Sequence, residues 1–251
     1  MRPPTESKLP AVTASFWVMK IAATTLGETA GDLLSMTLGV GYAASSLTLV
    51  SAFLVCLVLQ LLARRYHPPL YWLVILTTST AGTTMSDYMD RTLGLGYAKG
   101  AALLVALLLT VLGLWRLATG SLSVDRVTTR KAELFYWIAI LFSNTLGTAL
   151  GDFLSDSSGL GFAGGAALIG GLLALVLCAT YFTKASRVLL FWIAFVLTRP
   201  FGATVGDVLT KPRTAGGLAL GTAGSSGVLA AILIAFVAWA SVKQRRVVTA
   251  E

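Results

Sequence analysis

Long apolar segments alternate with short polar connections along the whole 251-residue chain. Each segment is roughly 20 residues long, the length that an α-helix needs to cross the hydrocarbon core of a bilayer. The pattern therefore predicts eight membrane-spanning helices in one membrane domain, residues 1–251. The predicted spans are approximately residues 12–32, 43–63, 70–89, 98–117, 134–154, 162–182, 188–208 and 219–240.

The eight spans form four repeats of two spans each. In every repeat a tryptophan is followed fifteen positions later by an aspartate, as from position 17 to position 32 in the first repeat. The repeats are predicted at about 11–65, 66–120, 131–186 and 187–246, with 121–130 as a central cytoplasmic connection. The tryptophans are Trp17, Trp72, Trp137 and Trp192, and the aspartates are Asp32, Asp87, Asp152 and Asp207.

The even number of spans in each repeat determines how the repeats are related. All four must enter the membrane in the same direction, so they are parallel repeats related by an axis along the membrane normal. We therefore expect an all-α integral membrane protein in which the first helices of the four repeats surround a common axis or form two paired pseudo-twofold halves. The longer central connection favours a two-plus-two division.

Small residues precede each aspartate at positions i and i+4. Such pairs let membrane helices approach closely, so we interpret them as packing notches. Three repeats close with a second glycine pair and an aromatic ring, whereas the fourth has a longer connection around residues 210–214. The small-residue pairs are Gly27/Gly31, Gly82/Ser86, Gly147/Gly151 and Gly202/Gly206.

A polar stripe leads to each aspartate in four-residue steps, which keep side chains on one face of a helix. If the four stripes faced one axis, their ionised aspartates would repel one another and would need bound protons, a metal cation or Lys20 and Arg199 to neutralise them. In repeats one to four the stripes are Lys20, Thr24, Glu28 and Asp32; Ile75, Ser79, Thr83 and Asp87; Ile140, Asn144, Thr148 and Asp152; and Phe195, Arg199, Ala203 and Asp207.

Composition and charge narrow the class of protein. The chain is 56% hydrophobic and only 12% charged, whereas about 25% of residues are charged in a typical soluble domain. Its net charge of +8 lies in short loops beside predicted spans, so nucleic-acid binding is not expected. The positive-inside rule places both termini in the cytoplasm. The residues behind this orientation are Arg2, Lys8, Arg64, Arg65, Arg116, Arg126, Arg130, Lys131, Lys184, Arg187, Lys243, Arg245 and Arg246, against Arg91, Lys99, Lys211 and Arg213 in the opposite loops.

These features resemble a bacterial membrane-protein family built of four tandem repeats of unknown function, each with two transmembrane segments and a tryptophan. The four tryptophans and the small-residue pairs before the aspartates carry the resemblance, which covers nearly the whole chain. It implies a multi-pass protein of the bacterial inner membrane and no particular activity. Glu28-Thr29-Ala30-Gly31-Asp32 is also loosely similar to the Glu-x-Gly-Asp signature of cation and manganese exporters, with one residue more in the spacing.

The repeated carboxylates suggest the chemistry. A carboxylate in hydrocarbon is costly and usually faces an interior cavity with a partner. Carboxylate, hydroxyl and amide oxygens favour Mg²⁺, Mn²⁺ or Ca²⁺. We therefore predict a divalent-cation transporter, for which proton coupling is an option, with no cofactor beyond a bound divalent cation. Its metal ligands are Glu28, Asp32, Asp87, Asp152 and Asp207, helped by Thr24, Ser79, Asn144, Thr83 and Thr148, with Lys20 and Arg199 as counter-charges to the acids.

Two other readings stay open. A proton-coupled transporter of a small organic or anionic solute would bind its substrate through Lys20 and Arg199. A structural or assembly protein would use the aspartates as helix ends that reach water. An enzyme is not expected, because none of the four aspartates has the Gly-x-Gly-Asp arrangement of intramembrane aspartyl proteases. We interpret the tryptophans as interfacial anchors in contact with the lipid bilayer, and a homo-oligomer is compatible with the sequence.

Overall fold

The computed structural model describes residues 9–248, with side chains up to residue 244, and this part of the chain is helical without strands. Arg2, Lys8 and the side chains of Arg245 and Arg246, which contribute to the predicted charge asymmetry, lie outside the described residues. The long helices are α1 (Ala14–Asp32), α2 (Tyr42–Leu62), α3 (Pro68–Asp87), α4 (Tyr97–Thr119), α5 (Arg130–Asp152), α6 (Gly161–Phe182), α7 (Arg187–Thr210) and α8 (Thr222–Val248).

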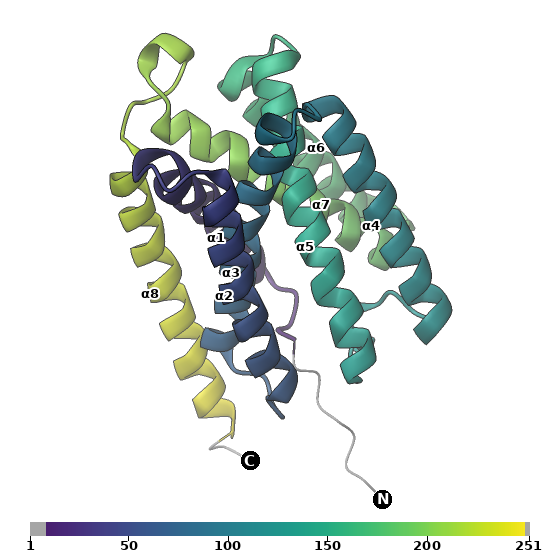
Figure 1. Ribbon diagram of the computed structural model, residues 1–251. Coiled ribbons are helices and arrows are strands. Elements are labelled where there is room, and N and C mark those ends of the chain that lie inside the picture. The colour runs from purple at the N-terminus through teal and green to yellow at the C-terminus, as the bar shows by residue number, and fades with distance from the viewer. Residues whose placement is uncertain (1–8, 249–251) are drawn as a thin grey trace, which may run out of the picture.

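The odd-numbered helices form a closed inner ring. Helix α1 packs against α3, α3 against α5, α5 against α7, and α7 against α1. Each even-numbered helix lies outside the ring, on the odd helix of the following repeat, and α8 closes the circle by packing on α1. The start of α1 and the end of α8 lie at the same end of the bundle (Figure 1). We call this the tryptophan end, and the opposite end the aspartate end.

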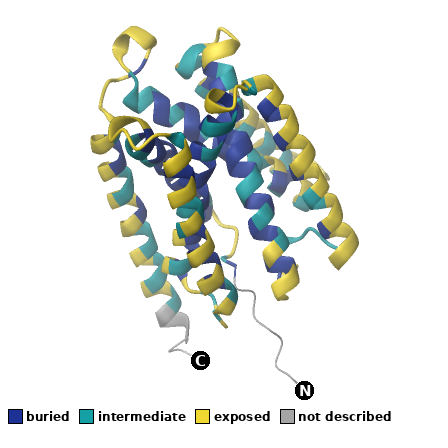
Figure 2. Cartoon of the chain, viewed as in Figure 1, coloured by how far each residue is buried: buried dark blue, intermediate teal, exposed yellow. Residues whose placement is uncertain are grey.

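Burial separates the two sets of helices. The even helices expose most of their apolar residues, with only 11% to 33% of their most apolar windows buried, against 67% for α5 and 50% for α7. Buried residues gather in the middle of the bundle and exposed ones on its outside (Figure 2). An apolar exterior over a buried polar interior is the arrangement expected of a protein surrounded by lipid.

Within the described residues, six helices are long and apolar enough to cross a membrane: α2, α4, α5, α6, α7 and α8. Helices α1 and α3 are not among them. Helix α1 carries Lys20, Glu28 and Asp32, and α3 is rich in threonine and serine. Nearly all of these polar side chains are buried, so the two helices with the most polar sequences belong to the inner ring.

The glycine pairs pack as predicted, and they explain how the ring closes. A Cβ atom at Gly27 would lie 2.5 Å from Ser79 Cβ, and one at Gly31 would lie 2.9 Å from Thr83 Cβ. The small residues of each odd helix therefore receive the polar stripe of the next one. The same relation recurs for Gly82 with Asn144, for Gly147 with Arg199, and for Gly202 and Gly206 with Thr24 and Glu28.

Replacement of Gly27 by alanine should therefore destabilise the ring. The new methyl group would also meet the backbone carbon of Ser79 at 3.0 Å, and backbone cannot move aside as a flexible side chain can. Overpacking of this kind costs about 1–3 kcal/mol. The matched control is Gly113→Ala on α4, where an added Cβ meets no atom within 4 Å. Thermal melting in detergent should show a lower Tm for Gly27→Ala only. Equal Tm values for both variants would show that the close contact between Gly27 and Ser79 does not require glycine.

The tryptophans correct one prediction. Three of them are not interfacial anchors in lipid, because Trp72, Trp137 and Trp192 are at most 5% exposed, whereas Trp17 is only partly buried. They join an aromatic cluster inside the tryptophan end, in which the hydroxyl oxygens of Tyr71 and Tyr136 lie 2.6 Å apart. Edge-to-face ring contacts connect these residues, and this is an arrangement that aromatic pairs prefer. In the last three repeats the tryptophan is thus a core residue that closes the inner ring at this end.

Candidate functional site

The four stripes converge and form an axial column of four layers. From the tryptophan end, each odd helix contributes one side chain to each layer, and no member of the column is more than 4% exposed. The first layer is Lys20, Ile75, Ile140 and Phe195; the second is Thr24, Ser79, Asn144 and Arg199; the third is Glu28, Thr83, Thr148 and Ala203; and the fourth is Asp32, Asp87, Asp152 and Asp207.

A buried ion pair occupies the middle of the column. Arg199 Nη1 donates to Glu28 Oε2 at 2.9 Å, and Arg199 Nη2 donates at 2.6 Å to the hydroxyls of both Thr83 and Thr148. Those two hydroxyls in turn donate to Glu28 Oε2 at 3.2 and 3.3 Å. Arg199 therefore is a counter-charge, as predicted, but its partner is Glu28 and not the aspartates.

Lys20 departs from its predicted role. Its ammonium donates to Asn144 Oδ1 at 3.5 Å and lies 4.1 Å from the centre of the Phe195 ring. Asn144 also donates to Thr78 Oγ1 at 3.0 Å. The structure thus gives Lys20 an amide and an aromatic face as neighbours in place of a carboxylate. On the same helix, Lys20 stands eight residues before Glu28 and twelve before Asp32. The second separation is about 18 Å along the helix axis, so Lys20 is too far away to bind the aspartates directly.

Two cations that the sequence analysis assigned only to loops neutralise the aspartates. Arg91 binds Asp87 at 3.0 Å and Asp152 at 3.3 Å. Lys211 binds Asp32 at 3.0 Å and Asp207 at 3.2 Å. Each cation therefore joins the aspartate of its own repeat to that of the next repeat around the ring.

These two cations could have been found in the sequence. Arg91 and Lys211 each stand four residues after an aspartate, so they continue the stripe by one more helical step. The other two repeats have Met36 and Asp156 at this position. The fourfold pattern therefore becomes twofold at the aspartate end, with a cation in the second and fourth repeats.

Burial and charge act in opposite directions on Lys211. Burial alone would lower the pKa of its ammonium, but the carboxylates of Asp207 and Asp32 outweigh this effect and raise the pKa above its ordinary value. Lys211 therefore carries its charge at neutral pH. Its side chain is 24% exposed, whereas those of Asp32 and Asp207 are 6% and 2% exposed. The lysine thus lies between these carboxylates and the outside of the aspartate end.

Three carboxylates come together beneath Lys211, and we call Glu28, Asp32 and Asp207 the acid triad. One oxygen from each lies within 4.8 Å of the others. Asp207 Oδ1 binds Lys211, whereas the buried Asp207 Oδ2 has no hydrogen-bond partner among the described residues. At an effective dielectric constant near 20, two ionised carboxylates at this separation repel by roughly 3 kcal/mol. The triad therefore needs neighbouring positive charge, and Lys211 and Arg199 supply two cations.

The five predicted metal ligands thus fall into two groups. Glu28, Asp32 and Asp207 form the triad, while Asp87 and Asp152 share Arg91. Among the predicted polar helpers, Thr83 and Thr148 contact Glu28 directly. The remaining helpers lie one layer deeper: Thr24 donates to the Thr198 carbonyl, Ser79 accepts a bond from Arg199 through its carbonyl, and Asn144 contacts Lys20.

The repeat pattern is also that of a known family. A model described as Repeat of Unknown Function (DUF347) matches residues 15–66, 70–121, 135–186 and 190–246. The chain belongs to the DUF347 family. The four matches correspond to the four predicted repeats, and each DUF347 repeat supplies one odd helix to the ring and one even helix to the outside. No curated protein and no solved structure matches the chain significantly.

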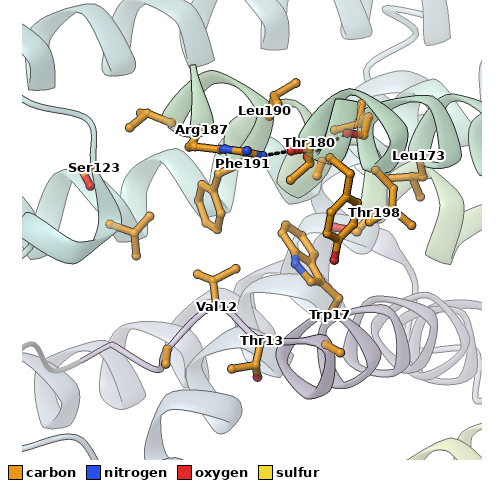
Figure 3. A pocket seen from close by; sticks show the side chains of 18 of the residues that line it. Val12, Thr13, Trp17, Ser123, Leu173, Thr180, Arg187, Leu190, Phe191 and Thr198 are labelled. Carbon is orange, nitrogen blue, oxygen red and sulfur yellow. Dashed lines mark hydrogen bonds between the residues drawn. The ribbon is translucent and has the colours of Figure 1, made fainter. Parts of the chain in front are cut away.

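This DUF347 protein also has an apolar cavity of about 960 Å³ beside the column. It lies between the first half of α1, the connection at residues 122–125, and helices α6 and α7. Trp17 and Phe191 face this space with ring centroids 5.8 Å apart (Figure 3). Its lining residues include neither Lys20 nor Arg199 nor any triad member. The cavity is therefore separate from the charged site.

Proposed function

We propose that this protein is a transporter of a divalent metal cation in the bacterial inner membrane, with the acid triad as its ion site. The observation that carries the proposal is the convergence of three buried carboxylates from α1 and α7 on one point. Three carboxylates inside an apolar bundle are costly to bury, and ionisable residues within a membrane usually mark an ion pathway.

The membrane topology is part of the proposal. We infer that α1 and α3 span the bilayer as the other six long helices do, because both are enclosed by neighbours that meet the length and polarity criteria. Their polar side chains turn to the column, so lipid does not contact them. Four parallel repeats then place the triad near one membrane surface.

The donor set favours a hard cation. The triad offers carboxylate oxygens, and the hydroxyls of Thr83 and Thr148 adjoin Glu28. Oxygen ligands of this kind suit Mg²⁺, Mn²⁺ and Ca²⁺. Oxygens on opposite sides of such an ion lie about 4–5 Å apart, which fits the 4.8 Å limit within the triad.

The charge balance favours a divalent ion. Five carboxylates of the column meet three cations in ionic contact, namely Arg91, Arg199 and Lys211. Two negative charges remain among these groups; Lys20, in the first layer, is left out of this count because it has no ion pair with a carboxylate of the described residues. One divalent cation would neutralise them, and two protons would do so when the ion leaves. Proton exchange is therefore the expected counter-movement.

The two alternatives have weaker support. A transporter of an anionic solute would need free cations, but Arg199 is already bound to Glu28 and both threonines, and Lys20 is enclosed with Asn144 and Phe195. A structural protein would account for the packed ring but not for three carboxylates held together. Flux measurements separate these readings.

The test of the function is cation uptake by proteoliposomes that contain the purified full-length protein. With a metal-sensitive dye inside, Mn²⁺, Mg²⁺ or Ca²⁺ should enter faster than into empty vesicles, and K⁺ or Na⁺ should not. Movement of the internal pH together with the metal would establish proton exchange. Uptake equal to that of empty vesicles for every cation in the panel would leave the structural reading.

The orientation of the chain gives a separate prediction. Because basic residues concentrate at the tryptophan end, we expect both termini and the connections near Arg65, Arg126 and Lys184 to be cytoplasmic. Fusions of a periplasm-active reporter after residue 246 should be inactive, whereas fusions within the connection near Arg213 should be active. A periplasmic signal from the C-terminal fusion would reverse the orientation of all four repeats.

A further inference from the structure

Lys211 is placed where the ion of the proposed function would have to enter. Its ammonium binds two of the three triad carboxylates, Asp32 at 3.0 Å and Asp207 at 3.2 Å. Glu28, the third, is neutralised by Arg199, which lies one layer closer to the tryptophan end. Lys211 is also the most exposed of these groups. An ion that approaches from the aspartate end therefore meets Lys211 before it meets the triad.

The same oxygens cannot serve a metal ion and Lys211 together. A Mg²⁺ or Ca²⁺ ion binds oxygens at about 2.0–2.6 Å, so an ion on Asp32 and Asp207 would lie close to the ammonium and repel it. The ammonium must therefore move away as the ion binds. Its four-carbon stem allows this movement without a change in the backbone.

The backbone at Lys211 is firmly held. The Lys211 amide donates to the Asp207 carbonyl at 2.9 Å. The longer connection folds back on the end of α7, with Leu218 N–H donating to the Val208 carbonyl and Leu220 N–H to the Leu209 carbonyl. The side chain is thus tethered at a fixed point beside the triad. Only the fourth repeat has this longer connection.

We propose that Lys211 is a specificity-determining residue, a tethered cation that reserves the acid triad for divalent ions; the inference rests on the proposed function. An ion that takes its place must supply more charge than the ammonium does. A monovalent ion would exchange one positive charge for another and gain nothing, whereas a divalent ion brings one charge more to a triad whose three carboxylates have only Arg199 and Lys211 in ionic contact. Lys211 therefore opposes Na⁺ and K⁺ more effectively than Mn²⁺ or Mg²⁺.

The first experiment compares Mn²⁺ binding to the purified protein at low and high Na⁺, in wild type and in Lys211→Met. Methionine keeps an unbranched side chain and removes the charge. The variant should bind Mn²⁺ about tenfold more tightly at low Na⁺, and high Na⁺ should remove most of that gain, since monovalent ions now enter the triad. Wild-type binding should depend far less on Na⁺.

Arg91→Met is the matched control, because it removes the equivalent cation from the aspartates outside the triad. Its Mn²⁺ affinity and Na⁺ dependence should match those of wild type. If Lys211→Met binds Mn²⁺ as wild type does and with the same Na⁺ dependence, the specificity role is wrong while the ion site stands. If neither protein binds Mn²⁺ at all, the proposed function itself is wrong.

A second measurement does not depend on folding of the variant. In the wild-type protein, a membrane-impermeant amine reagent should modify Lys211 faster when Mn²⁺ is present, because the ion displaces the ammonium toward solvent. Peptide mass spectrometry measures this rate, with Lys99 as the internal reference. An unchanged or slower reaction of Lys211 on saturation with Mn²⁺ would identify the lysine as a fixed structural clamp and overturn the inference.

Discussion

Replacing Arg199 by methionine should lower the free energy of unfolding by about 3–5 kcal/mol, the usual effect of removing one partner of a buried ion pair. Arg199 is fully buried, and it supplies hydrogen bonds to Glu28, Thr83 and Thr148. Methionine would retain the stem that packs against Gly147 but would leave Glu28 charged and without its cation. The loss should appear as a fall in Tm on the order of 10 °C.

The double variant Glu28→Gln/Arg199→Met shows whether the pair is the cause. It removes both charges together, and glutamine still accepts bonds from the two threonines. We expect it to recover most of the stability, since a pair of apolar or neutral groups of similar volume often replaces a buried ion pair at little cost. A double-mutant cycle would then give a coupling energy above about 2 kcal/mol.

The matched control is Arg116→Met. Arg116 is exposed near the end of α4, so the same substitution there should change stability by no more than about 0.5 kcal/mol. If the double variant melts as low as Arg199→Met alone, the arginine stabilises the ring through packing and its charge is incidental. The double variant should not transport cations even when stable, because Glu28 is a member of the triad.

The sequence predicts the ring because two independent periodicities agree. Four-residue steps define both the polar stripes and the small-residue pairs, and the ring joins them by seating each stripe in the next helix's notch. That relation requires the small residues to lie beside the stripe on the same helix, as they do at Gly27 and Glu28. An even number of spans per repeat then leaves a closed circle as the simplest packing.

The counter-charges could not be assigned from the spans alone. Helix periodicity placed Lys20 on the stripe with Glu28, but it did not show which acids the lysine reaches. Twelve residues separate Lys20 from Asp32, about 18 Å along the helix axis. Arg91 and Lys211 follow the last predicted span residues, so charge counting placed them in loops. In the structure the polypeptide continues past Asp87 as a short π-helix, Tyr88–Thr92, which carries Arg91 back over the column.

The tryptophans were misjudged for a related reason. A tryptophan near the end of an apolar span is typical of the lipid interface, and a single helix considered alone supports that view. In this fold the odd helices are covered by the even helices of the neighbouring repeat. The tryptophan position therefore faces protein, and ring packing around Tyr71 and Tyr136 replaces contact with the membrane surface.

Replacing Asp32 by asparagine should reduce divalent-cation flux by about 100-fold or more, because even the outer-shell partners of a metal site contribute 10–100-fold to affinity or activity. Asp32 belongs to the acid triad, and asparagine keeps its size while removing the charge that a divalent ion requires. The protein should remain folded, since the change reduces repulsion among three close carboxylates.

Asp87→Asn is the matched control for that prediction. The same substitution is made at the equivalent position of the next repeat and in the same layer, but Asp87 binds Arg91 and lies outside the triad. Its flux should stay within a few-fold of wild type. The comparison needs Mn²⁺ uptake by proteoliposomes and the Tm of each variant. Equal loss in both variants would assign the ion pathway to the whole aspartate layer, and normal uptake in both would leave the repeated aspartates with a role in packing alone.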